Sequence, residues 1–252
     1  MKKGKIVSGV ILGVIGIVGI LFGCGESEKQ KINRYINEMG VRAKSPARDA
    51  YSRMLVQIGA PAVEPLIYNL KNNPDRMIRA YSALTLSEIG DKSAEQPIKN
   101  TLSDKNPEVR AHAATALTKL ISSKAIPNLI EMLKDLDATP RESAQNCLVK
   151  LGDVAIDPLI ECLSQSNPSL RSQARVILGR MGRKTLPKLI DLLESTSDPN
   201  IQIITARTMA DIGDKSVLDN IKKIADFYTG NDETTKSTRK SLMGAYDDLR
   251  QK

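Results

Sequence analysis

The chain has 252 residues, of which 41% are hydrophobic and only 3% aromatic, with no tryptophan. This composition is typical of an ordered body and favours closely packed small helices over a β-sandwich, where aromatic and β-branched residues usually dominate. The formal charge of +8 includes Lys2, Lys3 and Lys5 of the N-terminal segment, and acidic and basic residues alternate along most of the remaining chain, which argues against a dedicated nucleic-acid module.

Metal ligands are scarce in the sequence. The chain has one histidine, His112, and three cysteines, and none of the cysteines belongs to a CxxC motif or to a cysteine–histidine cluster. This pattern argues against a zinc, haem or di-iron site built from the usual ligands. We therefore expect no cofactor.

Residues 1–24 form the first segment and read MKKGKIVSGVILGVIGIVGILFGC. Basic residues precede an apolar run over residues 6–22, which is the arrangement of a secretory signal. The last four residues resemble the lipobox of bacterial lipoproteins, in which a small residue precedes a cysteine that becomes lipidated. Phe22 departs from that pattern, because a small or modest aliphatic residue is usual there. The resemblance implies lipidation at Cys24 and a membrane-anchored, extracytoplasmic body.

An uncleaved single-pass membrane helix is the alternative for this segment. The apolar run is near the short end of the length that spans a bilayer. Gly9-x-x-x-Gly13 and Gly19-x-x-x-Gly23 would supply a helix-packing face. Both alternatives hold the body at a membrane, and they differ in whether the residues before Cys24 are removed.

Residues 25–46 hold a polar tether and a first helix. The tether reads GESEKQ, and the helix that follows carries Ile32, Tyr35, Ile36 and Met39. Spacings of three and four residues place these four side chains on one helical face.

Three columns of residues then recur over residues 47–225 with a period of about 31 residues. Leucine-rich helices end at Met39, Leu70, Leu102, Leu133, Leu163, Leu193 and Ile224. Alanine-rich helices begin at Arg48, Arg79, Arg110, Arg141, Arg171 and Gln202. These second helices end at Gly59, Gly90, Ile121, Gly152, Gly182 and Gly213.

Local chemistry explains where the helices of each repeat begin and end. Asn106-Pro107, Asn167-Pro168 and Asp198-Pro199 place an N-cap residue before a proline at the first helical position. Glycine after the last turn can take the left-handed conformation that ends a helix. Because both helices of a hairpin carry apolar faces, one hairpin cannot bury both, and neighbouring hairpins must stack.

Residues 106–133, which read NPEVRAHAATALTKLISSKAIPNLIEML, resemble the HEAT-like repeats of the phycobilin-lyase type. The resemblance covers about residues 47–225. It implies an all-α fold, a right-handed α-solenoid of about six to seven stacked helical hairpins. Such repeats occur in scaffolds, lyases and DNA-repair enzymes, so the resemblance predicts the fold far more sharply than the function.

Residues 226–252 depart from the repeat. A polar loop with Gly230 is followed by a predicted amphipathic helix over residues 234–250, with Leu242, Met243, Tyr246 and Leu249 on its apolar side. A polar terminal helix is what a capping element of a solenoid needs.

The arginine column is the most regular polar feature. An arginine in the first turn of a second helix can pair with an Asp or Asn of the preceding turn, such as Asp104, Asp135 or Asn167. Resemblance to HEAT units favours this structural role over a ligand-binding ladder. We expect it for Arg48, Arg79, Arg110, Arg141 and Arg171.

The exposed side of the second helices is the better candidate for binding. Residues two, five and nine positions after each column arginine fall on that side. In HEAT-like solenoids this helix typically lines the concave surface, so the resemblance implies a partner-binding role there. The candidates are Tyr81, His112, Lys119, Lys150 and Arg180. A solvated face without a dedicated ligand is the alternative.

Two other residue types carry no expected chemistry. No carboxylate or nucleophile recurs beside His112 at a helical spacing, so we expect no catalytic role for it. Cys147 and Cys162 align with apolar positions of other repeats and are expected in the core. A disulfide between them remains an open alternative, because sequence does not fix its geometry.

We therefore predict a membrane-anchored scaffold, and not an enzyme, that binds a protein or peptide through its concave face. A bilin-lyase-like enzyme is one alternative, and the predicted export argues against it because bilin attachment takes place inside the cell. A nucleic-acid-binding protein is another. It would need clustered basic residues and stacking aromatic side chains, which are few here.

Overall fold

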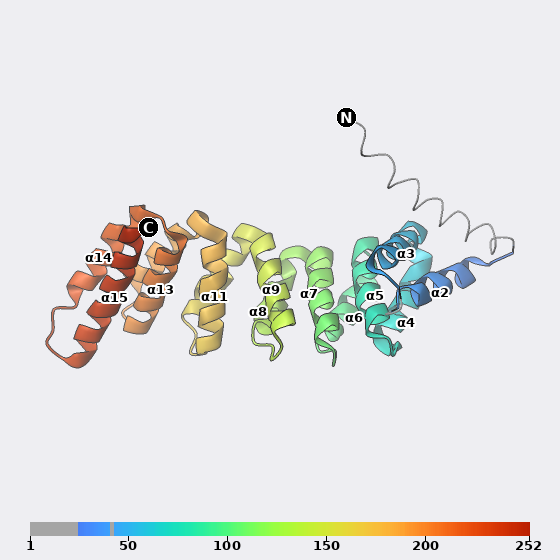
Figure 1. Ribbon diagram of the computed structural model, residues 1–252, viewed down its shortest axis with the longest axis horizontal. Coiled ribbons are helices and arrows are strands. Elements are labelled where there is room, and N and C mark those ends of the chain that lie inside the picture. Colours follow the sequence, from blue (N-terminus) through green and yellow to red (C-terminus); the bar gives the residue numbers. More distant parts are fainter. Residues whose placement is uncertain (1–24, 41–42) are drawn as a thin grey trace, which may run out of the picture. The chain divides into compact units, whose positions relative to one another are not determined.

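The computed structural model describes residues 25–40 and 43–252. The predicted anchor with Cys24 lies outside these described residues. All regular structure in the described part is helical (Figure 1), which confirms the prediction of an all-α repeat solenoid. The described residues form two compact units, divided after Ile89, and each is described by itself.

The N-terminal unit contains helices that pack around one small core. Its elements are α2 (Glu28–Glu38), α3 (Ser45–Ile58), α4 (Val63–Asn72) and α5 (Arg76–Ile89). Helix α3 packs between α2 and α5, and α4 packs along α5. Ile36, Leu55 and Leu66 are completely or almost completely buried among them, as their spacing predicts.

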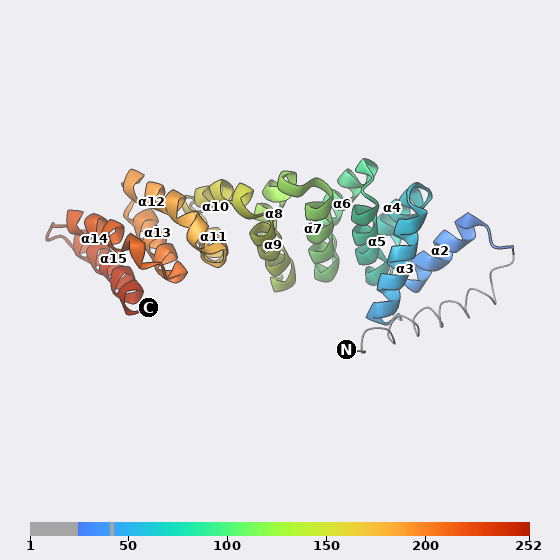
Figure 2. The same ribbon diagram turned by 90° about the horizontal axis from the view of Figure 1, so that it is seen from above.

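The C-terminal unit continues the same alternation of shorter and longer helices. Its elements are α6 (Glu95–Thr101), α7 (Pro107–Ile121), α8 (Ile126–Met132), α9 (Ala138–Leu151), α10 (Ile156–Leu163), α11 (Pro168–Met181), α12 (Leu186–Ser195), α13 (Pro199–Ile212), α14 (Leu218–Phe227) and α15 (Glu233–Gln251). Helices α7, α9, α11, α13 and α15 contact one another in sequence and form one row. Helices α10, α12 and α14 form part of the other row (Figure 2).

The packing defines the hairpins differently from the sequence repeat. Residues 106–133 contain α7 and α8, which a short 3-10 helix at Ser122–Ala125 connects. Yet α8 packs more extensively against α9 than against α7, and α10–α11 and α12–α13 repeat this pairing. Leu129 and Leu148 are fully buried between such partners. Each structural hairpin is therefore a leucine-rich helix with the alanine-rich helix that follows it.

The predicted helix starts are confirmed in their atomic detail. The Asn106 carboxamide oxygen accepts hydrogen bonds from the backbone N–H groups of Glu108 and Val109, at 3.0 and 3.3 Å. Asn167 and Asp198 cap α11 and α13 in the same way. These bonds satisfy N–H groups that have no partner inside the helix.

The predicted end of the second helix at Ile121 is confirmed, but Ile121 is the last helical residue, whereas the glycines of this column follow the last helical residue. Ile121 is the last residue of α7, and Ser122 takes the place that Gly152 and Gly182 hold after α9 and α11. The reason is that α7 is one residue longer than those two helices. Ser122 has φ 51°, and it is the one non-glycine residue with positive φ in the described part of the chain.

The predicted closing helix is α15. It packs against both α13 and α14 and buries Leu242, Ala245 and Leu249. Its opposite side carries small and polar residues. None of the helices in residues 25–40 and 43–252 is long and apolar enough to cross a membrane.

Candidate functional site

The column arginines bind backbone carbonyls near the end of the preceding turn. The Arg79 guanidinium donates to the Asn73 carbonyl at 2.9 Å, and Arg141 donates to the Asp135 carbonyl at 2.7 Å. Arg110 and Arg171 make the same bond to Asp104 and Gln165, and Arg48 donates to the Gly40 carbonyl at 3.2 Å. Each bond links the start of a second helix to the chain that precedes it.

This geometry adds backbone carbonyls to the partners that the sequence predicts for the arginines. Asp and Asn side chains are the predicted partners, and Asp135 does pair with a column arginine, Arg110 of the preceding repeat. The Asp104 carboxylate accepts from the backbone N–H of Asn106, and the Asn167 side chain accepts from that of Leu170. These groups also cap the turn, and Arg110 and Arg171 reach the backbone carbonyls of Asp104 and Gln165 in the same turns.

Arg110 makes one further set of contacts, with the next repeat. Its Nε and Nη2 donate to both carboxylate oxygens of Asp135, and Nη2 also donates to Asp137 at 2.6 Å. Hydrogen bonding to the Arg110 guanidinium holds the pKa of Asp135 below its ordinary range, against the opposing effect of burial. Arg110 therefore joins two consecutive repeats as well as two parts of its own.

Gln202 takes the place of the arginine in the sixth repeat for a visible reason. Its Nε2 donates to the Thr196 carbonyl at 2.8 Å, which is the bond that the arginines make. Its Oε1 accepts from the Tyr228 hydroxyl at 2.6 Å. An arginine has no acceptor and could not receive this second bond.

Two of the predicted binding residues are partly engaged in the fold. Tyr81 lies on α5 of the N-terminal unit, with the Arg48 guanidinium 5.8 Å from its ring centre. The His112 Nδ1 lies 2.7 Å from the Glu108 carbonyl on the preceding turn of α7. A carbonyl only accepts, so this nitrogen carries the proton and donates.

The other three predicted residues share one face of the C-terminal unit. Lys119, Lys150 and Arg180 are exposed and occupy equivalent positions on α7, α9 and α11, which pack side by side. We call these three residues the basic stripe. Arg180 also donates from Nη2 to the Asn146 carboxamide at 2.8 Å, a contact between neighbouring helices.

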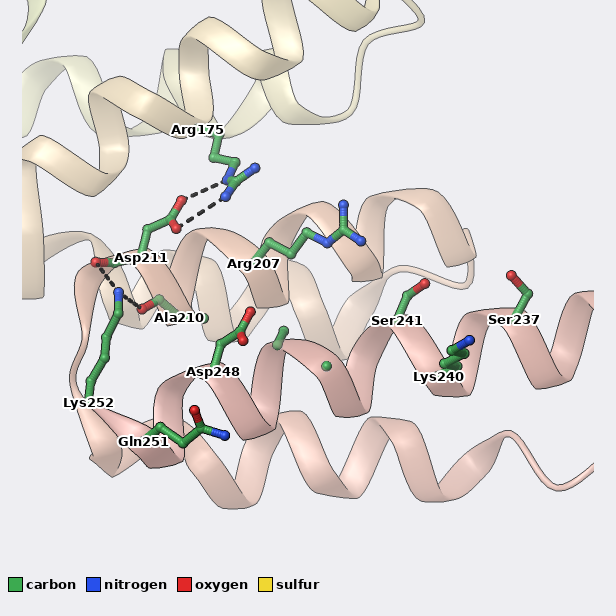
Figure 3. A pocket seen from close by; sticks show the side chains of 12 residues that line it. Arg175, Arg207, Ala210, Asp211, Ser237, Lys240, Ser241, Asp248, Gln251 and Lys252 are labelled. Atoms are coloured by element: carbon green, nitrogen blue, oxygen red, sulfur yellow. Dashed lines mark hydrogen bonds and ion pairs between the residues drawn. The ribbon is translucent and has the colours of Figure 1, made fainter.

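A groove that sequence reasoning missed lies on the same row of helices. It has a volume of about 930 Å³ and runs along α15 opposite α13, with Arg175 of α11 at its side (Figure 3). Its lining includes Arg207, Lys240, Ser237, Ser241, Gly244 and Asp248. We call this feature the α13–α15 groove.

Some basic side chains of the groove have hydrogen-bond partners in the described chain, and others have none. Arg175 binds both oxygens of Asp211, at 2.7 and 3.1 Å, and Lys252 donates to the carbonyls of Ala210 and Asp211 at the end of α13 (Figure 3). Arg207 and Lys240 make no hydrogen bond or ion pair with any other described residue. Two cations therefore face the groove without a protein partner in the described chain.

A smaller hollow of about 200 Å³ adjoins the groove. Arg175 and Arg207 line both of them, and the hollow adds Arg171, Asn200, Ile203 and Ile204. The sequence held only a weak signal for these residues. Arg207 falls in an exposed column, five positions after Gln202, but Lys240 and Ser241 belong to the closing helix, which has no repeat to compare.

The two cysteines of the described residues do not form a site. Cys147 and Cys162 are buried, and both are free. Burial raises the pKa of the Cys162 thiol. Within residues 25–40 and 43–252, no group of three or more His, Cys, Asp or Glu side chains could hold a metal ion.

Comparisons with known proteins agree with the fold. A family model described as HEAT repeats matches residues 48–149 and 156–238. A comparison with curated proteins gave no match. Among solved structures, YibA of Escherichia coli is 21% identical, with a TM-score of 0.46 over 100% of this chain and 99% of that one.

Two further structures are similar at the same level. The CpcE–CpcF complex of phycocyanin lyase from Nostoc sp. PCC7120 is 19% identical, with a TM-score of 0.42 over 90% of this chain and 96% of that one. The archaeal HEAT-like repeats protein from Thermococcus onnurineus NA1 is 16% identical, with a TM-score of 0.43 over 89% and 98%. Likenesses this distant carry no argument about function.

Proposed function

The chain belongs to the HEAT repeat family, and from this premise we propose that it is a non-enzymatic scaffold that binds a protein partner. The basic stripe carries the proposal. Lys119, Lys150 and Arg180 are exposed at equivalent positions of three helices that pack side by side. A row of like charges on a rigid helical face can steer and orient a partner of opposite charge.

The stripe suits a partner better than it suits a substrate. Stacked helices expose side chains over a long surface, because each repeat contacts only its neighbours. His112, the one histidine, donates from Nδ1 to the main chain of its own helix. This contact suits a positioned surface residue, and it does not arrange His112 against a nucleophile.

Reversal of the stripe tests the proposal. A variant with Lys119, Lys150 and Arg180 all changed to Glu should lose a partner that crosslinks to the wild-type chain in isolated membranes. The matched control changes Lys134, Lys188 and Lys222 to Glu, which alters the net charge equally on exposed residues outside the α7–α9–α11 row. Capture of the same partner by the stripe variant would rule out the stripe as its binding face.

We further propose that the scaffold is tethered to a membrane and acts outside the cytoplasm. Support comes from the sequence of residues 1–24, in which basic residues, an apolar run and Cys24 follow one another. Cys24→Ala should abolish incorporation of a radioactive fatty acid, whereas Cys147→Ala should leave it intact. Equal labelling of the Cys24→Ala variant would contradict lipidation at this residue.

A further inference from the structure

The α13–α15 groove is long enough to hold a short piece of extended chain. From Ser237 to Asp248 the helix rises by about 16 Å, the length of about five residues of extended peptide. The wall along this line includes the small residues Ser241, Gly244 and Ala245. A Cβ added at Gly244 would meet no atom within 4 Å, so the space above the helix is open.

The lining also has a net positive charge. Arg175 and Asp211 offset each other through two hydrogen bonds. Arg207 and Lys240 have no partner among the described residues. Apart from Asp211, Asp248 is the only acidic residue that lines the groove. Arg171 extends the positive charge into the adjoining hollow.

Hydroxyl donors lie beside these cations. Ser237 and Ser241 are one turn apart on α15 and flank Lys240, and Figure 3 shows them along the same stretch of the helix. Arginine, lysine and hydroxyl groups together are suited to carboxylates, which accept several charge-assisted hydrogen bonds at once.

We propose that the α13–α15 groove binds an acidic, extended peptide segment of a partner protein, with its carboxylates on Arg207 and Lys240. The inference rests on the proposed scaffold function and adds a second contact surface and the chemistry of the partner. The open wall at Gly244 accommodates the peptide backbone. Charge complementarity favours an acidic occupant over a basic or neutral one.

Fluorescence anisotropy with a labelled hexaglutamate peptide tests this assignment on the full chain. We expect saturable binding of hexaglutamate at low salt and none of hexaglutamine. Arg207→Glu combined with Lys240→Glu should weaken binding at least ~10-fold. The charge-matched control, Lys188→Glu with Lys222→Glu, should bind as the wild type does.

A second variant separates shape from charge. Gly244→Leu adds a side chain where there is open space and removes a helix-interior glycine, so it should fold at least as well as the wild type. It should still weaken hexaglutamate binding by ~10-fold or more, because the peptide backbone loses its place. Binding unaffected by Gly244→Leu, or equally weakened by the control pair, would show adsorption through net charge and overturn the proposal.

Other occupants give different results. Inorganic phosphate that displaces the peptide as effectively as unlabelled hexaglutamate would identify a site for a free anion. Self-association of the chain in sedimentation, lost on Arg207→Glu with Lys240→Glu, would identify a second copy. Either result would overturn the assignment to a partner peptide.

The two surfaces are tested separately. The Lys119, Lys150 and Arg180 reversal should leave hexaglutamate binding unchanged, because the stripe lies outside the groove. If capture of the partner depends on the stripe but hexaglutamate does not bind, the groove assignment fails and the scaffold stands. If hexaglutamate binds the groove but capture of the partner does not depend on the stripe, the stripe is not the binding face, and the groove assignment stands.

Discussion

Arg110 holds Asp135 through two parallel hydrogen bonds, from Nε to Oδ2 at 2.7 Å and from Nη2 to Oδ1 at 2.8 Å. Both side chains are mostly buried, with 13% and 12% of their surface exposed. A planar guanidinium that meets both oxygens of a carboxylate is the strongest geometry for such a pair. Because the two residues belong to consecutive repeats, the pair fixes one repeat against the next.

Asp135→Asn should therefore destabilise the C-terminal unit by about 2 kcal/mol, since the mostly buried guanidinium loses its bidentate carboxylate and keeps only the more exposed Asp137 carboxylate. Asp137→Asn is the matched control. Asp137 also binds Arg110 but is 54% exposed, so its loss should cost less than about 1 kcal/mol. Urea denaturation followed by circular dichroism measures both. Equal losses in the two variants would contradict the special role of the Asp135 pair.

The same pair predicts a dependence on pH. Hydrogen bonding to Arg110 lowers the pKa of Asp135 from its ordinary value of 3.8. A carboxyl group whose pKa is lower in the folded state stabilises the fold fully above its ordinary pKa, and that contribution is lost as the pH falls through the lowered value. The gap in stability between the wild type and Asp135→Asn should thus be constant near neutral pH and shrink in acid. Denaturation midpoints across the acid range measure it, and a gap that does not shrink would contradict the prediction.

Ser122→Gly should stabilise the protein. Ser122 has φ 51° and ψ −124°, a conformation that disfavours any residue with a Cβ. Glycine would remove strain of about 1–3 kcal/mol while losing about 0.5–1 kcal/mol of backbone entropy on folding. We expect a net gain of about 1 kcal/mol in denaturation experiments.

The reverse change at an equivalent position provides the control. Gly182 has φ 76°, and a Cβ there would meet no atom within 4 Å. Gly182→Ser should therefore destabilise through backbone strain alone, by about 1 kcal/mol. A neutral effect at both positions would show that the helix ends relax without cost.

The N-terminal unit offers a prediction about buried hydroxyl groups. The Ser82 hydroxyl is fully buried and has no hydrogen-bond partner among the described residues, so Ser82→Ala should raise stability by about 1 kcal/mol. Ser52, also buried, instead bonds the Thr85 hydroxyl at 2.8 Å, so Ser52→Ala should lower it by about 1 kcal/mol. Thermal unfolding of the two variants checks the opposite signs. Two effects of the same sign would contradict the assignment of hydrogen bonds.

The repeat made most of the fold predictable. Residues that cap and terminate helices act locally, so Asn106, Asn167 and Asp198 predict helix starts without any tertiary information. The positive φ of Ser122 could not be predicted, because a serine rarely takes a conformation typical of glycine. It follows from the length of α7, which only the structure shows. The bonds of the arginines to backbone carbonyls could not be predicted for a related reason, since backbone carbonyls leave no trace in sequence.

The candidate site was predictable only where it repeats. Lys119, Lys150 and Arg180 could be placed on one face because each occupies the same column. Lys240 lies on the closing helix, outside every column, so its position opposite Arg207 depends on how α15 packs on α13. A site made by a capping element needs the structure, because the repeat ends where that element begins.

Gln202 and Tyr228 provide a test of why the arginine column ends. The Tyr228 hydroxyl donates to Gln202 Oε1 at 2.6 Å, while Gln202 Nε2 keeps the bond to the Thr196 carbonyl. Gln202→Arg would preserve the carbonyl bond and remove the acceptor, so it should cost about 1 kcal/mol, and Tyr228→Phe a similar amount.

The two changes should not add. Once Gln202→Arg has removed the acceptor, a hydroxyl at position 228 contributes nothing to this bond, so the double variant should be no less stable than Gln202→Arg alone. Additive losses in the double variant would show that Gln202 and Tyr228 stabilise the unit independently.

Burial also raises the pKa of Tyr228 above its ordinary value of 10.0. Because the pKa of Tyr228 is higher in the folded state, its neutral hydroxyl stabilises the fold fully below the ordinary pKa, and this stabilisation is lost as the pH rises through the raised pKa. The gap between the wild type and Tyr228→Phe should therefore shrink in strong alkali.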